Sequence, residues 1–299
     1  MIEDASWPRA DSWLARNDKN PTLVVIGVPT SVASLSPSKA YQTPHRFRGV
    51  LGRFSTFHSD RGVDVGSLSV ADLGDWQVSS LGLEEYQPAI EASARRLAKG
   101  PVYAFLGGDN GITSPLVRGV ARGQLGRVGV LTFDAHHDVR TLDRGPTNGT
   151  PIRGLIDDGL PGEHVIQIGI HSFANSLEYR TYCDEHRIRI ATMETVEAQG
   201  LAAVVGAALE GLGDQCEWIY VDFDIDVLDR AYAPACPSAQ PGGMRPRQLA
   251  TAAWLCGQHP QVRAVDFVEV DASVDVNDLT LMNMANVFLS FAAGVAARE

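Results

Sequence analysis

The chain has 299 residues, 44% of them hydrophobic, which is enough to bury a full core as one large α/β domain. Its net charge of −11 argues against a duplex nucleic-acid binder, because such proteins cluster Lys and Arg against phosphates. The apolar runs, such as residues 22–28, are far shorter than the roughly 20 residues that span a bilayer. We therefore expect neither a nucleic-acid nor a membrane partner.

The start of the sequence and its cysteines favour a reducing compartment. The first residues, MIEDASWPRADSW, are acidic and mixed, without the positive and then apolar pattern of a secretory signal. The cysteines are scattered without a CxxC pair, which predicts buried, reduced thiols at Cys183, Cys216, Cys236 and Cys256. The expected location is the cytoplasm.

Short apolar or β-branched runs recur along the chain and predict strands that are buried on both faces. They lie at 22–28, 102–107, 128–134, 164–170, 187–193, 217–224 and 262–270. Helical spacing of apolar residues appears at 83–98 and at 245–258, where Pro246 suits a first helical turn. Alternating strands and helices, without a repeat or linker, predict one domain over residues 1–299, a three-layer α/β/α fold with a mostly parallel central sheet.

Two acidic clusters directly follow apolar runs, at the strand ends where parallel sheets collect ligands. Asp134, His136 and Asp138 follow one run, and Asp224 and Asp226 follow another. Residues two apart in extended backbone project to one side, so each set can converge. Four carboxylates in a partly desolvated cleft repel one another, and bound divalent cations are the natural compensation. Oxygen ligands with one nitrogen favour manganese or another fairly hard ion.

Each of these residues also has a simpler interpretation when it is taken alone. A single Asp at a strand end is most often a turn or helix cap. Caps do not require period-two runs at two separate strand ends, so we interpret the groups together as ligands. His137 points away from His136 and is expected to pack inside the fold, and Asp222 lies deeper in its strand, behind the ligands.

Five fragments resemble, in order, the signature motifs of the ureohydrolase family of arginases, agmatinases, guanidino-acid hydrolases and formimidoylglutamases. They are GGDN (107–110), FDAHHD (133–138), DFDIDVLD (222–229), APACPSAQPGG (233–243) and VEVD (268–271). The resemblance covers about residues 20–290. It implies an arginase-like fold, two Mn²⁺ ions, hydrolysis of a C–N bond in a linear amidine, and a homo-oligomer.

The resemblance also implies roles for individual residues. Asp134 and Asp224 match the carboxylates that the two ions share. The terminal ligands are matched by His136, Asp138 and Asp226. Glu269 matches the glutamate that faces the amidinium or guanidinium end of the substrate, with an ordinary strand-end Glu as the alternative. Asp138 is also placed to pass a proton to the leaving nitrogen.

Two positions depart from the common family pattern. Asn110 stands where GGDH carries a metal-binding His, and an amide oxygen is a weaker ligand than imidazole. This puts full occupancy of one manganese position in question, and a simple loop amide is the alternative for Asn110. Asn148 takes the place of a second family His that contacts substrate or moves protons in arginases and agmatinases.

The stretch NGTPIRGLID (148–157) is similar to bacterial formimidoylglutamases, which predicts N-formimidoyl-L-glutamate as substrate and L-glutamate and formamide as products. Arg140 follows Asp138 by two residues, and its guanidinium suits one of the two carboxylates of this small anionic amidine. Arg153 is the candidate for the other carboxylate, with a solvated helix-start Arg as the alternative. Two other functions stay open: a guanidino-acid, agmatine or arginine hydrolase that releases urea, and a metal-poor relative without catalysis.

Overall fold

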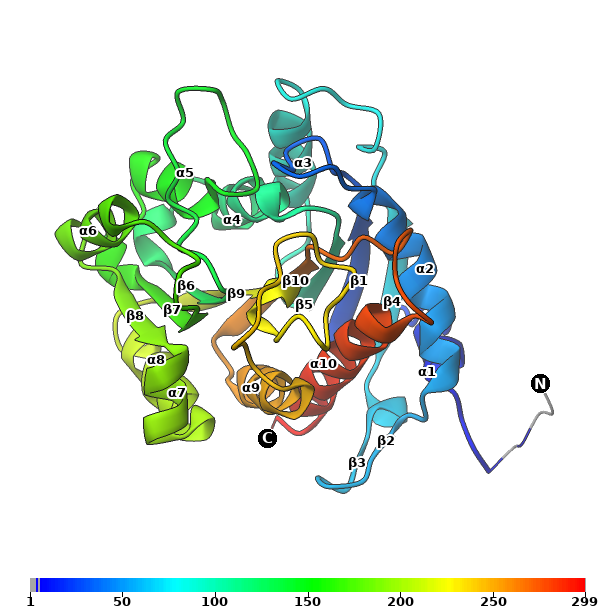
Figure 1. Ribbon diagram of the computed structural model, residues 1–299. Coiled ribbons are helices and arrows are strands. Elements are labelled where there is room, and N and C mark those ends of the chain that lie inside the picture. The colour runs from blue at the N-terminus through cyan, green and yellow to red at the C-terminus, as the bar shows by residue number, and fades with distance from the viewer. Residues whose placement is uncertain (1–3, 5, 299) are drawn as a thin grey trace.

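Eight parallel strands form the centre of the protein (Figure 1) within residues 4 and 6–298, which the computed structural model describes. Along the sheet they lie in the order β4, β1, β5, β10, β9, β6, β7, β8. In that order they span Val70–Asp75, Leu23–Val28, Val102–Gly107, Val262–Val268, Trp218–Asp224, Val128–Phe133, Val165–Ile170 and Arg189–Thr192. A small antiparallel ribbon of β2 (Phe57–His58) and β3 (Val63–Asp64) lies outside this sheet.

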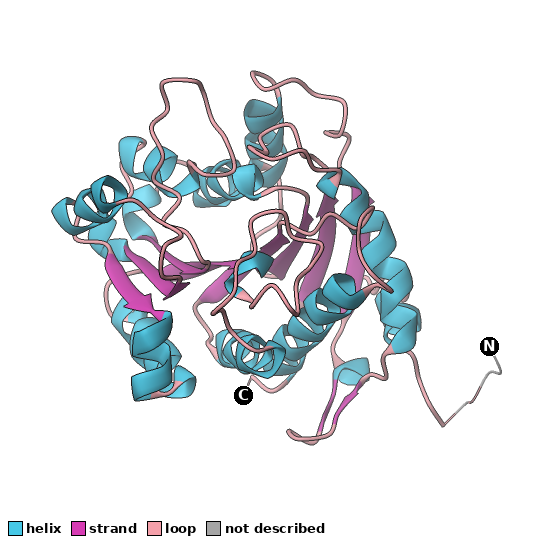
Figure 2. Ribbon diagram, viewed as in Figure 1, coloured by secondary structure: helices cyan, strands magenta, loops and turns pink. Residues whose placement is uncertain are grey.

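Helices cover both faces of the sheet and produce three layers (Figure 2). On one face lie α3, α4, α5 and α6, which span Tyr86–Arg95, Thr113–Ala121, Pro151–Asp157 and Leu177–Glu185. On the other lie α1, α2, α7, α8, α9 and α10, which span Ala10–Leu14, Thr43–Val50, Met193–Gln199, Leu201–Gly213, Pro246–Gln258 and Leu279–Ala296. The predicted three-layer α/β/α class with a parallel central sheet is confirmed.

The central strands are mostly apolar because the helices bury both faces of the sheet. In β1 every residue is buried, with Leu23 and Val25 in one core and Val24 and Ile26 in the other. A strand of this kind alternates between two apolar cores and so has no polar face. This is why the predicted runs coincide with β1 and with β5 to β10.

The edge strand β4 was not predicted, because Asp72 and Asp75 interrupt its apolar character. Arg48 of α2 binds both carboxylates, with nitrogen–oxygen distances of 2.5 Å to Asp72 and 2.6 Å to Asp75. An edge strand has only one neighbour, and polar residues there also block pairing with other chains. Such a strand lacks the continuous apolar run that predicts the central strands.

The helix α10 corrects the expectation that every apolar run is much shorter than a membrane span. Its 18 residues have a mean hydropathy of 1.5, so by length and composition it could cross a membrane. In the fold 67% of that window is buried, and the helix packs against α9 and the sheet. Burial in the core accounts for its composition. The sequence does not show this helix as one continuous apolar run, because Asn283, Asn286 and Ser290 interrupt it.

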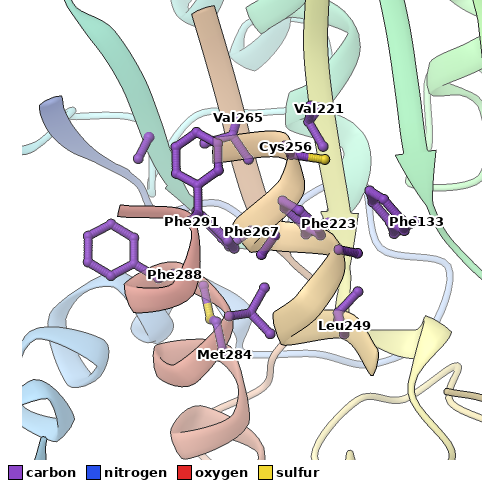
Figure 3. Packing of buried hydrophobic residues seen from close by; sticks show 14 of the residues in the cluster. Phe133, Val221, Phe223, Leu249, Cys256, Val265, Phe267, Met284, Phe288 and Phe291 are labelled. Carbon is purple, nitrogen blue, oxygen red and sulfur yellow. The ribbon is translucent and has the colours of Figure 1, made fainter. Parts of the chain in front are cut away.

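Three phenylalanines on neighbouring strands stack next to the carboxyl edge of the sheet (Figure 3). Phe133, Phe223 and Phe267 are partners across β6, β9 and β10. Their ring centroids lie 4.9 Å and 5.4 Å apart, with interplanar angles of 8° and 9°. From α10, Phe288 and Phe291 meet Phe267 edge-on. The stack holds three strands in register at the edge where acidic residues follow.

Truncation of the central ring should cost a large share of the stability. Because Phe223 is buried between two other rings, we expect Phe223→Ala to lower the free energy of unfolding by about 3–5 kcal/mol, as for other buried aromatics. Urea denaturation measures this change. The control is Phe57→Ala in β2, whose side chain is 54% exposed and whose loss should cost about 0.5 kcal/mol or less. Equal losses in the two variants would contradict the structural role of the stack.

Candidate metal and substrate site

The loops after four adjacent strands, β5, β10, β9 and β6, bring polar side chains together at the carboxyl edge of the sheet. These loops and the last residue of β9 carry the predicted residues Asn110, Asp134, His136, Asp138, Asp224, Asp226 and Glu269. Except for His136, each of these residues is 9% exposed or less. A group of carboxylates this deeply buried requires compensating charge or protons.

Asp134, His136 and Asp226 form the tightest group. One potential ligand atom from each lies within 4.8 Å of the others. The Nδ1 atom of His136 is 2.8 Å from Asp226 Oδ2 and 3.5 Å from Asp134 Oδ1. Asp224 adjoins them, since its Oδ1 accepts the backbone N–H of Asp226 at 2.8 Å. The structure thus brings residues from two separate strand ends to one point, as predicted. The expected extended backbone is wrong for Asp226, because residues Ile225–Val227 form a 3₁₀ helix that begins directly after Asp224.

Asp138 joins the group through its carboxyl and through an unusual backbone. Its carboxyl lies near the charge of Asp134, and its Oδ2 accepts the Nδ2–H of Asn110 at 2.6 Å. Its φ is +55°, a left-handed conformation that non-glycine residues rarely adopt. The backbone N–H groups of Ile152 and Arg153 donate to its carbonyl at the start of α5. These bonds hold the strained conformation in place.

The pKa values show a local excess of negative charge. Burial, assisted by the charge of Asp226, raises the pKa of Asp134 to about 6. Burial also raises the pKa of Asp138, with help from Asp134, and that of Asp224, with help from Asp226. The charge of Asp226 raises the pKa of His136 to about 12. Burial alone would raise the pKa of Asp226, but the His136 charge outweighs it and lowers that pKa.

This donor set fits a hard divalent cation. Carboxylate oxygens with a single imidazole nitrogen are the ligands that manganese accepts. In the chain by itself, the imidazolium of His136 supplies the positive charge between Asp134 and Asp226. A bound cation would take over that role and leave His136 neutral, as a nitrogen ligand must be.

Glu269 lies beside the cluster as a buried carboxylate on a strained backbone. Its Oε1 accepts the backbone N–H of Asn110 at 2.7 Å and the Nδ2–H of Asn148 at 3.0 Å. Its φ is +67°, and its own N–H donates to the carbonyl of Gly108 at 2.9 Å. Burial raises the pKa of Glu269 to about 7. Asn148 also accepts the N–H of Leu35 at 3.0 Å, so it links Glu269 to the loop after β1.

The two arginines predicted to bind substrate carboxylates differ in their surroundings. Arg140 is exposed and takes part in none of the ion pairs found among the described residues. Its stem packs over Gly149, where a Cβ would come within 2.6 Å of Arg140 Cδ. Arg153 donates Nε–H to the Val139 carbonyl at 3.1 Å and stacks on Tyr182 at 3.7 Å. Arg140 is therefore the freer of the two to meet an anion.

Two amides that the sequence analysis missed hold the loop that carries the ligands. The Oε1 of Gln167 lies 2.7 Å from His137 Nδ1, and its Nε2–H donates to the His137 carbonyl at 2.8 Å. Asn175 accepts the His137 N–H at 2.8 Å and donates to the Ala135 carbonyl at 3.0 Å. His137 is therefore packed inside the fold, as predicted. A glutamine inside the apolar run VIQIGI was the signal for Gln167.

Asp109, also missed, joins two loops of the site. Its carboxylate accepts the backbone N–H of Ala33 at 3.0 Å and that of Gly111 at 2.9 Å. The preceding Gly108 is required, because a Cβ there would lie 1.6 Å from the carbonyl oxygen of Thr30. The GGD part of the motif therefore serves close loop packing.

All four cysteines are buried free thiols, as predicted. One of them, Cys236, was not expected at the site. Its Sγ lies within 4.8 Å of potential ligand oxygens of Asp224 and Asp226. No strand periodicity links residue 236 to the cluster, because it belongs to the loop that follows β9. This loop lines the acidic group.

Known proteins resemble the chain in sequence and in fold. The sequence model of the arginase family matches residues 21–294. The chain is 39% identical to the formimidoylglutamase of Halalkalibacterium halodurans, over 90% of this chain and 86% of that one. The solved structure of formimidoylglutamase from Bacillus subtilis superposes with a TM-score of 0.94 at 34% identity, covering 100% of this chain and 95% of that one. Formiminoglutamase of Trypanosoma cruzi, solved with Mn²⁺, gives a TM-score of 0.89 at 25% identity, covering 98% and 100%.

We expect Mn²⁺ to stabilise the protein more as the pH rises. Asp134, Asp138 and His136 have raised pKa values, so ligation must displace their protons. A group whose pKa is raised by folding stabilises the metal-free chain at low pH and loses that contribution as the pH rises through its folded pKa. For Asp134 this window runs from about pH 4 to about pH 6. The gain in unfolding temperature on adding Mn²⁺ should therefore be larger at pH 8 than at pH 5.5.

Calorimetric titration of Mn²⁺ in two buffers of different ionisation enthalpy measures the protons released. Asp226→Asn should abolish both the proton release and the gain in unfolding temperature. The matched control is Asp60→Asn, whose side chain is 69% exposed and should leave both unchanged. A temperature gain that does not depend on pH would contradict the ligand assignment.

Proposed function

Because the chain belongs to the arginase family, we propose that it uses two manganese ions to hydrolyse N-formimidoyl-L-glutamate to L-glutamate and formamide. The broader class is that of the family: the chain is a hydrolase of C–N bonds in linear amidines. The finer proposal is supported by the similarity to formimidoylglutamases. The observation that carries it is the buried carboxylate and imidazole cluster beside Glu269. On the same loop as Asp138 lies Arg140, which forms no ion pair with any residue that the structure describes.

The acidic cluster is the proposed cation site. The ions would be held by Asp134, His136, Asp138, Asp224 and Asp226. Divalent cations held by these residues would lower the pKa of water and so would supply a hydroxide nucleophile near neutral pH. The presence of Mn²⁺ in the solved Trypanosoma cruzi relative supports the choice of manganese.

Glu269 is the proposed partner of the amidinium. Both of its side-chain hydrogen bonds within the described residues fall on Oε1, from Asn110 and Asn148. This leaves Oε2 to accept an N–H from the substrate. Burial raises the pKa of Glu269 to about 7 and so favours its neutral form. A cationic amidinium beside Glu269 would lower this pKa again and favour the ionised carboxylate. The bound pair then fixes the orientation of the reacting carbon.

Asp138 is the proposed carrier of the proton to the leaving nitrogen. Its buried carboxyl lies within the acidic cluster, next to the proposed ions, where a carboxylate can take up a proton and release it. A proton lost by the attacking water can therefore pass through Asp138 to the α-nitrogen of glutamate as the C–N bond breaks.

Arg140 is the proposed selector for an acidic substrate. Its guanidinium is exposed two residues after Asp138 and can bind a carboxylate with two parallel hydrogen bonds. A dicationic substrate such as agmatine would be repelled by it. Arg153 is a weaker candidate for the second carboxylate, because it already contacts Val139 and Tyr182.

A hydrolase of guanidino acids is the alternative, since it would use the same cluster and would also favour Arg140. A substrate panel separates the two functions. With Mn²⁺ present, we expect formamide from N-formimidoyl-L-glutamate and little or no urea from guanidino acids, arginine or agmatine. Urea as the main product would overturn the substrate proposal and leave the family assignment intact. Asp226→Asn is the inactive control in every reaction.

Removal of the Arg140 guanidinium should impair the reaction without affecting the metals. If it pairs with a substrate carboxylate, Arg140→Ala loses a charge-assisted contact of roughly 2–4 kcal/mol, or about 30- to 1000-fold in kcat/KM. The loss should lie mainly in KM, and the manganese content should stay the same. Arg263→Ala, an exposed arginine on β10 far from the carboxyl edge, is the matched control. Near-normal kcat/KM in Arg140→Ala would exclude its role in substrate binding.

A further inference from the structure

Thr113, the first residue of α4, lies between Asn110 and a buried carboxylate that the proposed mechanism does not use. Its Oγ1 is 2.7 Å from Asn110 Oδ1 and 2.7 Å from Asp266 Oδ2. Thr113 and Asp266 are completely buried, and Asn110 is 1% exposed. Their polar atoms can therefore bond only to other groups of the protein, and Oδ1 of Asp266 has no hydrogen-bond partner among the described residues.

Asp266 is an acceptor for several donors. Its Oδ2 also accepts the hydroxyl of Tyr220 at 2.8 Å. Asp222, which we predicted behind the ligands, lies opposite it on the neighbouring strand β9. Burial raises the pKa of Asp266 to about 6, so it is ionised in mildly alkaline solution. An ionised carboxylate makes stronger hydrogen bonds than a neutral amide oxygen does.

A threonine hydroxyl has one hydrogen, so Thr113 can donate to only one of its two neighbours. The charged Asp266 is the stronger acceptor. The amide oxygen of Asn110 would then face a lone pair of Thr113 Oγ1 at 2.7 Å, which is unfavourable. A half-turn of the amide removes this conflict, because Nδ2–H then donates to Thr113. The two ends of an amide have nearly the same shape, so the turn needs little space.

The half-turn changes which atom of Asn110 faces the acidic cluster. Nδ2 now donates to Asp138 Oδ2 at 2.6 Å, and after the turn Oδ1 takes its place. Two oxygens at that separation need a positive charge beside them. We propose that Thr113, anchored by Asp266, is a positioning residue that directs the amide oxygen of Asn110 to a metal ion shared with Asp138. This explains how an amide can replace imidazole there, and it rests on the manganese centre of the proposed function.

The test compares Thr113→Val, which keeps the shape and removes the hydroxyl, with Thr113→Ser, which keeps the hydroxyl. Stoichiometry and affinity for Mn²⁺ are measured by calorimetry and by electron paramagnetic resonance of free Mn²⁺. We expect Thr113→Val to lower the affinity for one of the two Mn²⁺ ions by about 10- to 100-fold, the usual effect of removing a group that hydrogen-bonds to a metal ligand. The other ion should keep its affinity, and Ser should bind both as the wild type does. If Thr113→Val does not fold, as judged by unfolding without metal, Thr113→Ala replaces it.

A double-mutant cycle distinguishes positioning from a general structural effect. In an Asn110→Ala background, Thr113→Val should cause no further loss of Mn²⁺ affinity, because the amide that it orients is gone. The same loss in both backgrounds, or normal affinity in Thr113→Val, would overturn this inference alone. Failure of the wild type to bind Mn²⁺ would overturn the proposed function and this inference with it.

Discussion

The stacking of Phe133, Phe223 and Phe267 sets the register on which the site depends. Successive residues of a strand point to opposite faces, so the rings on one side fix which residues point to the other. Asp134 and Asp224 directly follow two of the rings, whereas Glu269 lies beyond the end of β10 on a left-handed backbone, so strand alternation does not orient it. A slip of one residue in β9 would bury a carboxylate among the rings, and the large cost of that arrangement enforces the register.

The fold concentrates energetic cost at this edge of the sheet. Several carboxylates lie buried close together, and burial with mutual repulsion raises the pKa of Asp134, Asp138 and Asp224. Asp138 and Glu269 also adopt left-handed backbone conformations. The two apolar cores on either side of the sheet offset these costs, because burial of their side chains stabilises the fold independently of the charges at the strand ends. Strain and charge of this kind are typical of binding sites.

Two amides stand where the family commonly has histidines, and each contacts a carboxylate of the site. Asn110 donates to Asp138, and Asn148 donates to Glu269. An amide carries a hydrogen-bond donor at one end and an acceptor at the other. Unlike an imidazole, it does not gain a proton near neutral pH. These positions can therefore orient carboxylates without adding a titrating charge. Which end of the amide faces the cluster depends on the groups behind it, such as Thr113.

The sequence by itself determined the parallel sheet and most of the acidic cluster, because continuous apolar runs and period-two acidic runs are local properties of a strand and its end. It did not reveal β4, whose aspartates are held by ion pairs, or α10, whose polar residues interrupt its apolar run. The tertiary structure alone decided two of the partners of Asn110, which lie 28 residues away at Asp138 and 159 residues away at Glu269. Hydrogen bonds between loops of different strands leave no periodic trace in the sequence, because they depend on the order in which the strands pack.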